Sequence, residues 1–207
     1  IGVGECLRRA IHKSVISQLK PALAEHLWPQ QVAIGVSGGL SILVFGVRLM
    51  LEVFPNWVVV KIDLRNAYNE IIRARVLQRL AAVPHVRDLV PPLWANCLPE
   101  SMIFLPADGQ TLADFPSAEG MQQGEPFAGA GFCVAIHPEV CQLDNELQLV
   151  GGMAKFDMDD GYAVGPAEAV FPAILRFADA VRPLGLELQL GKCKCFCPHG
   201  GMEDNPH

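Results

Sequence analysis

Three acidic residues, Asp63, Asp159 and Asp160, stand where carboxylates from distant parts of the chain can meet. Asp63 follows the short apolar run Trp57–Ile62, and the other two lie within the turn-like segment DMDDG. Short β-branched runs are typical of buried strands, so we expect each acid at the end of a strand. Mg²⁺ prefers such oxygen ligands, and two of these ions held by converging carboxylates support phosphoryl transfer. The pattern therefore indicates metal-assisted phosphoryl transfer.

Each of these acids also has an ordinary structural explanation. An Asp at a strand end commonly forms a turn or caps a helix, and Asp-Gly is common in hairpin turns. The combination of a strand-end Asp with an acidic hairpin favours the metal site, because adjacent strand ends in one sheet can hold both sets of ligands rigidly.

The elements that must position these acids mix helices with antiparallel strand pairs. Hydrophobic periodicity predicts helices at residues 5–27, 40–54, 66–81, 86–97, 126–146 and 167–183. Strands are predicted at residues 57–62, 102–105, 111–115, 149–156 and 162–164, with a final strand pair near 186–197. Because the order lacks regular βαβ alternation, the sequence predicts an α+β fold with helices packed on one sheet face.

Two of the predicted helices carry specific expectations. In the helix at 5–27, apolar residues at helical spacing form a stripe made of Leu7, Ile11, Val15 or Ile16, and Leu19. Pro21 is expected to end or kink this helix. In the helix at 66–81, residues four apart form a second apolar stripe made of Tyr68, Ile72, Val76 and Leu80.

Length and composition are those of one globular domain with a small appended subdomain. The chain has 207 residues, of which 51% are hydrophobic, and a net charge of −6. An acidic balance argues against a nucleic-acid-binding surface over the whole chain. The charge is segregated, however: Lys and Arg are absent from Asp88 to Ala154 and concentrate in Arg8–Lys20 and Lys61–Arg87. An ordinary solvated surface is the alternative explanation.

Cysteine usage and hydropathy favour an intracellular protein, in the nucleus or the cytoplasm, with no membrane association. The seven cysteines include Cys193, Cys195 and Cys197, whose strict alternation does not suit a disulfide framework. The longest charge-free apolar run, Val32–Val47, is shorter than the roughly 18 residues of a membrane span. Because the chain begins with Ile1, we interpret it as a fragment.

Four segments, taken in order, resemble the motifs of reverse transcriptases of the non-LTR retrotransposon and group II intron type. KIDLRNAYNEIIR is similar to motif A, GMQQGEPFAGAGFCVAIHP to motif B, DMDDG to motif C and LGLELQLGKCKCF to motif D. Upstream, GECLRRAIHK and VAIGVSGG resemble segments of the fingers. The resemblance implies RNA-directed DNA polymerase activity with two Mg²⁺ ions, or Mn²⁺ in their place. The implied partners are an RNA or DNA template, a DNA primer and deoxynucleoside triphosphates.

The resemblance also implies a domain organisation. Residues 1–55 correspond to partial fingers, residues 56–200 to a polymerase palm that contains motifs A to D, and residues 201–207 to a tail. Nothing after Cys197 resembles a primer grip or a helical thumb, and the Arg-Pro that usually precedes the first matched segment is not in the sequence. We therefore expect the remainder of a longer retroelement polyprotein outside this chain.

The family's functional residues map onto specific positions. Asp63 and Asp159 are expected to bind both metals with the carbonyl of Leu64, and Asp160 is expected to be a neighbouring acid aimed at the primer end. This implied site depends on the match of motifs A and C. Motif C departs from the family at Asp157, which stands where Tyr or Phe is usual and adds a third carboxylate.

Other matched positions surround the incoming nucleotide. Tyr68 occupies the steric-gate position, Gln123 and Gly124 are expected beside the nucleotide, and Lys192 matches a proton donor to pyrophosphate. Tyr68 is equally explained as helix core, and Lys192 as an ordinary surface lysine. Asn69 and Arg73 also match, with capping or a salt bridge as the alternative. In motif B, Glu125 replaces a frequent Asp.

Three alternatives remain open at this point. A serine hydrolase is suggested by GVSGG, a literal G-x-S-x-G around Ser37, with Asp159 and His199 as partners. A zinc site is suggested by Cys193, Cys195, Cys197 and His199, although alternation fits zinc spacing poorly. A catalytically inactive retroelement remnant would keep the same motifs without the activity.

Overall fold

The structure is a computed structural model that describes residues 6–97, 101–107, 110–122 and 124–199. Seven α-helices are described: α1 Cys6–Leu27, α2 Gly39–Val53, α3 Ala67–Glu70, α4 Arg73–Ala82, α5 Val90–Cys97, α6 Pro126–Gln148 and α7 Ala167–Val181. Three short 3₁₀ helices are described as well: η1 Arg87–Leu89, η2 Arg182–Leu184 and η3 Leu190–Lys192. No helix of the described part of the chain is long and apolar enough to cross a membrane.

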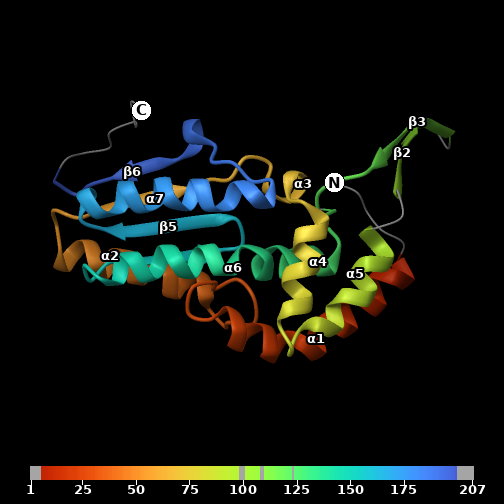
Figure 1. The fold of residues 1–207 in the computed structure, drawn as a ribbon, viewed down its shortest axis with the longest axis horizontal. Coiled ribbons are helices and arrows are strands. Elements are labelled where there is room, and N and C mark those ends of the chain that lie inside the picture. Colours follow the sequence, from red (N-terminus) through yellow and green to blue (C-terminus); the bar gives the residue numbers. More distant parts are fainter. Residues whose placement is uncertain (1–5, 98–100, 108–109, 123, 200–207) are drawn as a thin grey trace.

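The central element is a four-stranded antiparallel sheet with the order β4-β5-β1-β6. Its strands are β1 Val58–Ile62, β4 Met153–Asp157, β5 Asp160–Gly165 and β6 Lys194–Phe196. A separate hairpin of β2 Ser101–Ala107 and β3 Gln110–Ser117 projects away from the body (Figure 1). The predicted α+β class with antiparallel strands and packed helices is confirmed.

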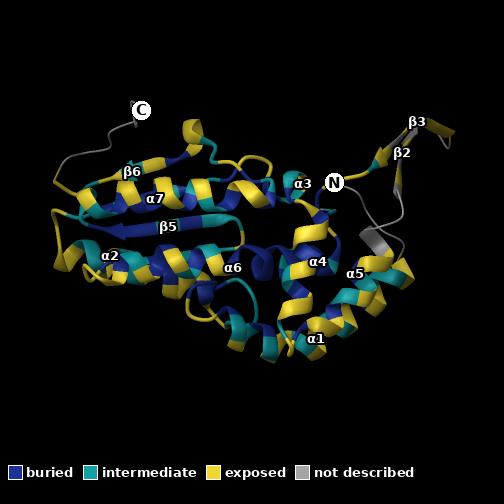
Figure 2. Ribbon diagram, viewed as in Figure 1, coloured by how far each residue is buried: buried dark blue, intermediate teal, exposed yellow. Residues whose placement is uncertain are grey.

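Helices α6 and α7 lie over one face of this sheet, where the core is buried (Figures 1 and 2). Burial alternates along β1, as expected for a strand with one face covered. The Phe156 ring on β4 contacts Phe177 on α7 at 5.5 Å between ring centroids. A Cβ at Gly161 would lie 2.5 Å from the Phe156 ring, so glycine at this position lets the aromatic ring cover β5.

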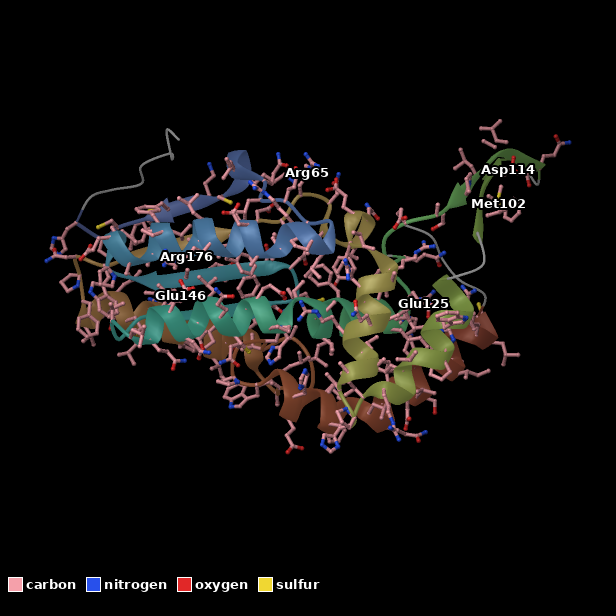
Figure 3. The ribbon with its side chains drawn as sticks, viewed as in Figure 1. Arg65, Met102, Asp114, Glu125, Glu146 and Arg176 are labelled. Atoms are coloured by element: carbon pink, nitrogen blue, oxygen red, sulfur yellow. The ribbon has the colours of Figure 1, made fainter. Side chains whose placement is uncertain are left out.

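The two long helices are also joined at their surface. Glu146 on α6 and Arg176 on α7 form an ion pair with 2.8 Å between Nε and Oε2 (Figure 3). Both side chains retain contact with solvent, so the pair contributes at most about 1 kcal/mol. Apolar burial between the helices and the sheet therefore holds this layer in place.

Helix α1 ends at Leu27, as predicted, but its predicted apolar stripe is partly wrong. Pro21 lies inside the helix and does not end it. An internal proline costs a helix about 3 kcal/mol, and the burial of Leu23 and Leu27, both 0% exposed, offsets that cost. The predicted stripe fails at its start, since Leu7 and Ile11 are 68% and 55% exposed.

The predicted single helix at 66–81 is in fact two helices, α3 and α4. Ile71 and Ile72 between them are extended, with ψ of 131° and 112°. The Ile72 amide donates to the Leu184 carbonyl at 2.9 Å, which replaces a helical bond with a long-range one. The segment at Gly185 approaches so closely that a Cβ there would lie 2.7 Å from the Glu70 carbonyl oxygen.

Two strand predictions also need correction. No strand pair forms near 186–197: β6 pairs with β1 instead, and Leu188 makes an isolated bridge to Leu64. The strand predicted from residue 149 begins at Met153, because the chain after α6 first turns through Gly151 with φ of 78°. Positive φ is readily adopted by glycine, so the turn is local in origin.

A buried carboxylate, Asp144 on α6, fixes the start of β4. It is 0% exposed and accepts hydrogen bonds from Gln30 Nε2 at 2.8 Å, Gln148 Nε2 at 2.7 Å and the Ala154 amide at 2.8 Å. The Lys155 ammonium lies 3.1 Å from its Oδ2. Buried charges are tolerated when they are paired and hydrogen-bonded in this way.

We predict that Asp144→Asn lowers the free energy of unfolding by about 3 kcal/mol, because Lys155 then loses its buried anion. Urea denaturation followed by circular dichroism measures this loss. Asp179→Asn is the control, since Asp179 forms an exposed pair with Arg182 and is expected to change stability by less than about 0.5 kcal/mol. Equal effects of the two substitutions would contradict the account.

Candidate active site

The register of three strands brings the acids of motifs A and C to one end of the sheet. Ile62 on β1 pairs with Gly161 on β5, so Asp63 continues β1 beside the turn that joins β4 to β5. That turn is closed by the pairing of Asp157 with Asp160, which places Asp159 within it. The sheet therefore brings together Asp63, Asp159 and Asp160, as the sequence predicts.

The electrostatics show that these carboxylates act on one another. Partial burial raises the pKa of Asp159, and the nearby charges of Asp160 and Asp63 raise it further. The pKa of Asp157 is raised by burial first and by Asp160 second. Adjacent like charges destabilise the ionised forms, so a bound cation would relieve the repulsion.

Lys61 distinguishes Asp160 from the other acids. Its ammonium lies 2.9 Å from Asp160 Oδ1, and this hydrogen bond is the main cause of the raised pKa of Lys61. The negative charge of Asp160 is thus partly neutralised by a lysine on the neighbouring strand β1. Lys61 acts on Asp63 and Asp159 only through its charge, so these two carboxylates are less neutralised by the lysine than Asp160 is.

The backbone beside Asp63 is held by the segment of motif D. The Arg65 amide donates to the Glu187 carbonyl, and the Gln189 amide donates to the Asp63 carbonyl, both at 2.8 Å. These two bonds flank Leu64 and neither uses its carbonyl, whose expected role as a metal ligand stays a prediction. The buried Leu64 side chain anchors the backbone there.

The donor set fits Mg²⁺ bound together with a nucleotide. Among the described residues, no group of three His, Cys, Asp or Glu side chains converges on one metal position. Two carboxylates and a carbonyl are hard oxygen ligands, and Mg²⁺ commonly binds one or two carboxylates while substrate phosphates and water complete its octahedron. The site therefore fits a metal that arrives with its substrate.

Cys193 and Lys192 lie in the same motif D segment but in different settings. The Asp63 amide donates to Cys193 Sγ at 3.5 Å, and burial raises the pKa of this thiol. Lys192 ends η3 and is exposed. Among the contacts of the described residues, none joins the Lys192 ammonium to Asp63, Asp159 or Asp160. Its expected role stays a prediction.

A pocket of about 410 Å³ opens beside Asp159 and is also lined by Tyr68, Gly124 and Met158. The Tyr68 ring stacks on Phe132 with 4.8 Å between centroids, and its hydroxyl donates to Met158 Sδ at 3.3 Å. Burial raises the pKa of Tyr68, so the phenol stays neutral. Residues from motifs A, B and C thus meet at one pocket, whereas Gln123 lies outside the described residues.

Arg73 has a role that the sequence did not reveal. Its buried guanidinium donates to the carbonyls of Ser117, Glu119 and Gly120 and to the Ser117 hydroxyl, at distances of 2.5 to 3.0 Å. These bonds hold the strand-to-helix loop that leads into Gly124. Arg73 therefore holds this loop rather than serving as a surface ion pair. The sequence signal that could have indicated this role is its position on the buried side of α4.

Glu125 lies at the start of α6 (Figure 3) and is likewise buried and paired. Its carboxylate contacts the imidazole of His12, and Arg8 Nη2 lies 3.6 Å from its second oxygen. The longer side chain of glutamate, which stands here in place of the family's frequent aspartate, thus contacts residues of α1. Sequence reasoning missed His12, because a histidine inside a mixed helix gives no signal of a partner more than 100 residues away.

The structure disfavours the two alternative sites. A nucleophile elbow requires a strand before its serine, but the segment before Ser37 forms only an isolated bridge from Gln31 to Phe156. For zinc, Cys193 lies against the Asp63 backbone, while Cys195 on β6 pairs with Val60 on β1. These two cysteines therefore make separate structural contacts.

Comparison with known proteins now gives the family. The family model described as reverse transcriptase (RNA-dependent DNA polymerase) matches residues 1–204, and the chain belongs to this family. A comparison with curated protein sequences gives no match. The match does not distinguish the non-LTR or group II intron type from other members.

Solved structures with the same fold include two yeast telomerases. Apo telomerase from Candida tropicalis superposes with a TM-score of 0.66 at 10% identity, over 93% of this chain and 37% of the telomerase. Telomerase from Candida albicans, solved in complex with a TWJ fragment of telomeric RNA, gives a TM-score of 0.64 at 11% identity, over 91% and 35%. The chain therefore spans just over a third of these proteins.

We predict that Arg73→Lys opens the loop at 117–120, because a lysine ammonium cannot reproduce the fork of guanidinium bonds. The free energy of unfolding should fall by about 2 kcal/mol, and limited proteolysis in this loop should accelerate. Arg75→Lys is the matched control: Arg75 is exposed on the same helix and contacts Gln78. Identical proteolysis patterns for both variants would contradict the role of Arg73 in holding this loop.

Proposed function

We propose that this chain contains the catalytic palm of an RNA-directed DNA polymerase, which extends a DNA primer along an RNA or DNA template. The observation that carries the proposal is the meeting of Asp63 and Asp159 at one end of the sheet. Membership of the reverse transcriptase family supports the same chemistry. Deoxynucleoside triphosphates are the proposed substrates.

The proposed metal site consists of the Asp63 and Asp159 carboxylates and the Leu64 carbonyl. Two Mg²⁺ ions, or Mn²⁺, would activate the primer 3′-hydroxyl and stabilise the charge on the transferred phosphate. Asp63 is fixed by the end of β1 and by the Gln189 bond, and Asp159 by the hairpin turn. Asp160, bound to Lys61, is the neighbouring acid that faces the primer end.

The pocket beside Asp159 is the proposed nucleotide site. Tyr68 would exclude a ribonucleotide 2′-hydroxyl, because its ring is held between Phe132 and Met158 and cannot easily move aside. Gly124 lines the pocket and would let the backbone approach the nucleotide, with Gln123 next to it. Lys192 is the proposed proton donor to the departing pyrophosphate.

The wider assignments rest on the sequence motifs. We propose that residues 1–55 form partial fingers, residues 56–200 the palm and residues 201–207 a tail, within a longer retroelement polyprotein of the non-LTR or group II intron type. The Candida albicans telomerase is named as a complex with telomeric RNA. That likeness supports nucleic acid as the partner of the shared fold.

An inactive remnant is the second candidate, and Asp157 is the observation that favours it. Asp157 stands where the family usually has Tyr or Phe, its backbone pairs with that of Asp160 across the turn, and its pKa is raised by burial and by Asp160. The two candidates share a fold and differ in whether the chain extends a primer.

Primer extension on an RNA template with Mg²⁺ tests the proposal. We predict extension by the wild-type chain and a loss of about 100-fold or more in Asp63→Asn and Asp159→Asn, because each removes a ligand whose metal contributes several kcal/mol.

Asp114→Asn is the matched control for this assay. Asp114 is exposed on the projecting β2–β3 hairpin (Figure 3), and its substitution should leave extension unchanged. Extension that is equal in all four proteins would overturn the proposed site. A folded wild-type chain without extension would favour the inactive remnant.

A further inference from the structure

Residues 30–32, which follow α1, run alongside the end of β4, next to the β4–β5 turn that carries Asp159. The Phe156 amide donates to the Gln30 carbonyl at 2.8 Å, and the Val32 amide donates to the Phe156 carbonyl at 2.9 Å. Gln31 thus forms a parallel bridge with Phe156. Within the same segment, the Gln30 side chain binds Asp144, so β4 is held near its start as well.

The side chain of Gln31 makes two reciprocal hydrogen bonds to a single residue of the turn. Gln31 Nε2 donates to the Met158 carbonyl at 2.6 Å, and the Met158 amide donates to Gln31 Oε1 at 3.0 Å. Gln31 is 0% exposed. A primary amide can both donate and accept in this way, whereas an apolar side chain of similar size would leave both backbone groups of Met158 without these partners.

The backbone that Gln31 holds is in an unfavourable conformation. Met158 has φ of 60°, in the left-handed region that L-residues other than glycine rarely adopt. This conformation costs about 1–2 kcal/mol, and each neutral hydrogen bond contributes about 1 kcal/mol. The two bonds from Gln31 are therefore of the size needed to stabilise the left-handed turn.

Met158 directly precedes Asp159, so the conformation of one sets the direction of the other. A change of φ and ψ at Met158 would rotate the Asp159 carboxylate away from Asp63, even if the β4–β5 pairing at Asp157 and Asp160 stayed intact. The strand register brings the turn to the site, but it does not by itself fix which way the second carboxylate points.

We infer that Gln31 is a positioning residue, which holds the Met158 turn so that the Asp159 carboxylate faces Asp63. Gln31 acts through the backbone of Met158. The inference rests on the proposed metal-dependent function of the two acids, and it adds a residue from outside motifs A to D to that site.

Mn²⁺ binding measured by electron paramagnetic resonance on the full chain tests the inference without any need for polymerase activity. We expect Gln31→Met to weaken Mn²⁺ affinity by about 10–100-fold, the usual effect of removing a group that orients a metal ligand. Hydrogen exchange at the Met158 amide should become faster in the same variant. In primer extension, kcat should fall while the KM for primer-template stays unchanged.

Gln142→Met is the matched control, because Gln142 lies on the exposed side of α6 and bonds only Glu146 in the described structure. Its Mn²⁺ affinity should equal that of the wild-type chain. If Gln31→Met does not fold, Gln31→Asn replaces it: this neutral variant keeps a primary amide, but its shorter side chain cannot reach the amide and the carbonyl of Met158 at the same time. The same weakening of Mn²⁺ binding is expected.

The outcomes separate the inference from the function on which it rests. A wild-type chain that binds no Mn²⁺ overturns the proposed metal site and the role of Gln31 with it. A wild-type chain and a folded Gln31 variant that bind Mn²⁺ equally overturn the positioning role alone. Weaker binding in the Gln31 variant, with the Gln142 control unchanged, supports the inference.

Discussion

The antiparallel pairing of β1 with β5 is the constraint on which the rest of the structure depends. Its register, with Ile62 opposite Gly161, places the end of one strand beside the turn of another. Gly161 allows that register, because the Phe156 ring occupies the space where a side chain would be. Helices α6 and α7 then cover the face that carries Phe156, and the acidic end of the sheet stays partly accessible (Figure 2).

The same pairing brings carboxylates close together, and neighbouring residues reduce the resulting charge repulsion or fix the backbone around it. One end of the sheet carries four carboxylates, those of Asp63, Asp157, Asp159 and Asp160. The pKa values of Asp157 and Asp159 are raised by burial and by the charge of neighbouring carboxylates. Lys61 binds one of the four, and the motif D segment fixes the backbone of another. Clusters of carboxylates with raised pKa values are common at functional sites. A bound cation at such a cluster would offset the repulsion between the carboxylates.

Local patterns explain which parts of this arrangement could be predicted from the sequence. The strand before Asp63, the acidic hairpin and the long helix after Gly124 each follow from a few adjacent residues. The break at Ile71 and Ile72 could not be predicted, because the Leu184 segment that causes it lies more than 100 positions away. Long-range packing also decided the outcome at Pro21, where burial overrode a local helix breaker.

The supporting residues were hidden for the same reason. Arg73 and Gln31 form hydrogen bonds with the backbone of loops that are distant in the sequence. An arginine in a helix, or a glutamine that follows a helix, gives no sequence signal of such a partner. The acids themselves have the opposite character: their type and position suggest a metal, and the fold determines whether they meet. The sequence could therefore name the candidate ligands, but the residues proposed to orient them needed the structure.

The most direct test of the central claim is to locate a metal in the folded protein. Crystals soaked in Mn²⁺ with a deoxynucleoside triphosphate, measured for anomalous scattering, would show where the ion binds. We predict a peak at coordination distance from carboxylate oxygens of both Asp63 and Asp159. A peak held only by Asp157 and Asp160, or a site in which Asp63 and Asp159 bind no common ion, would contradict it.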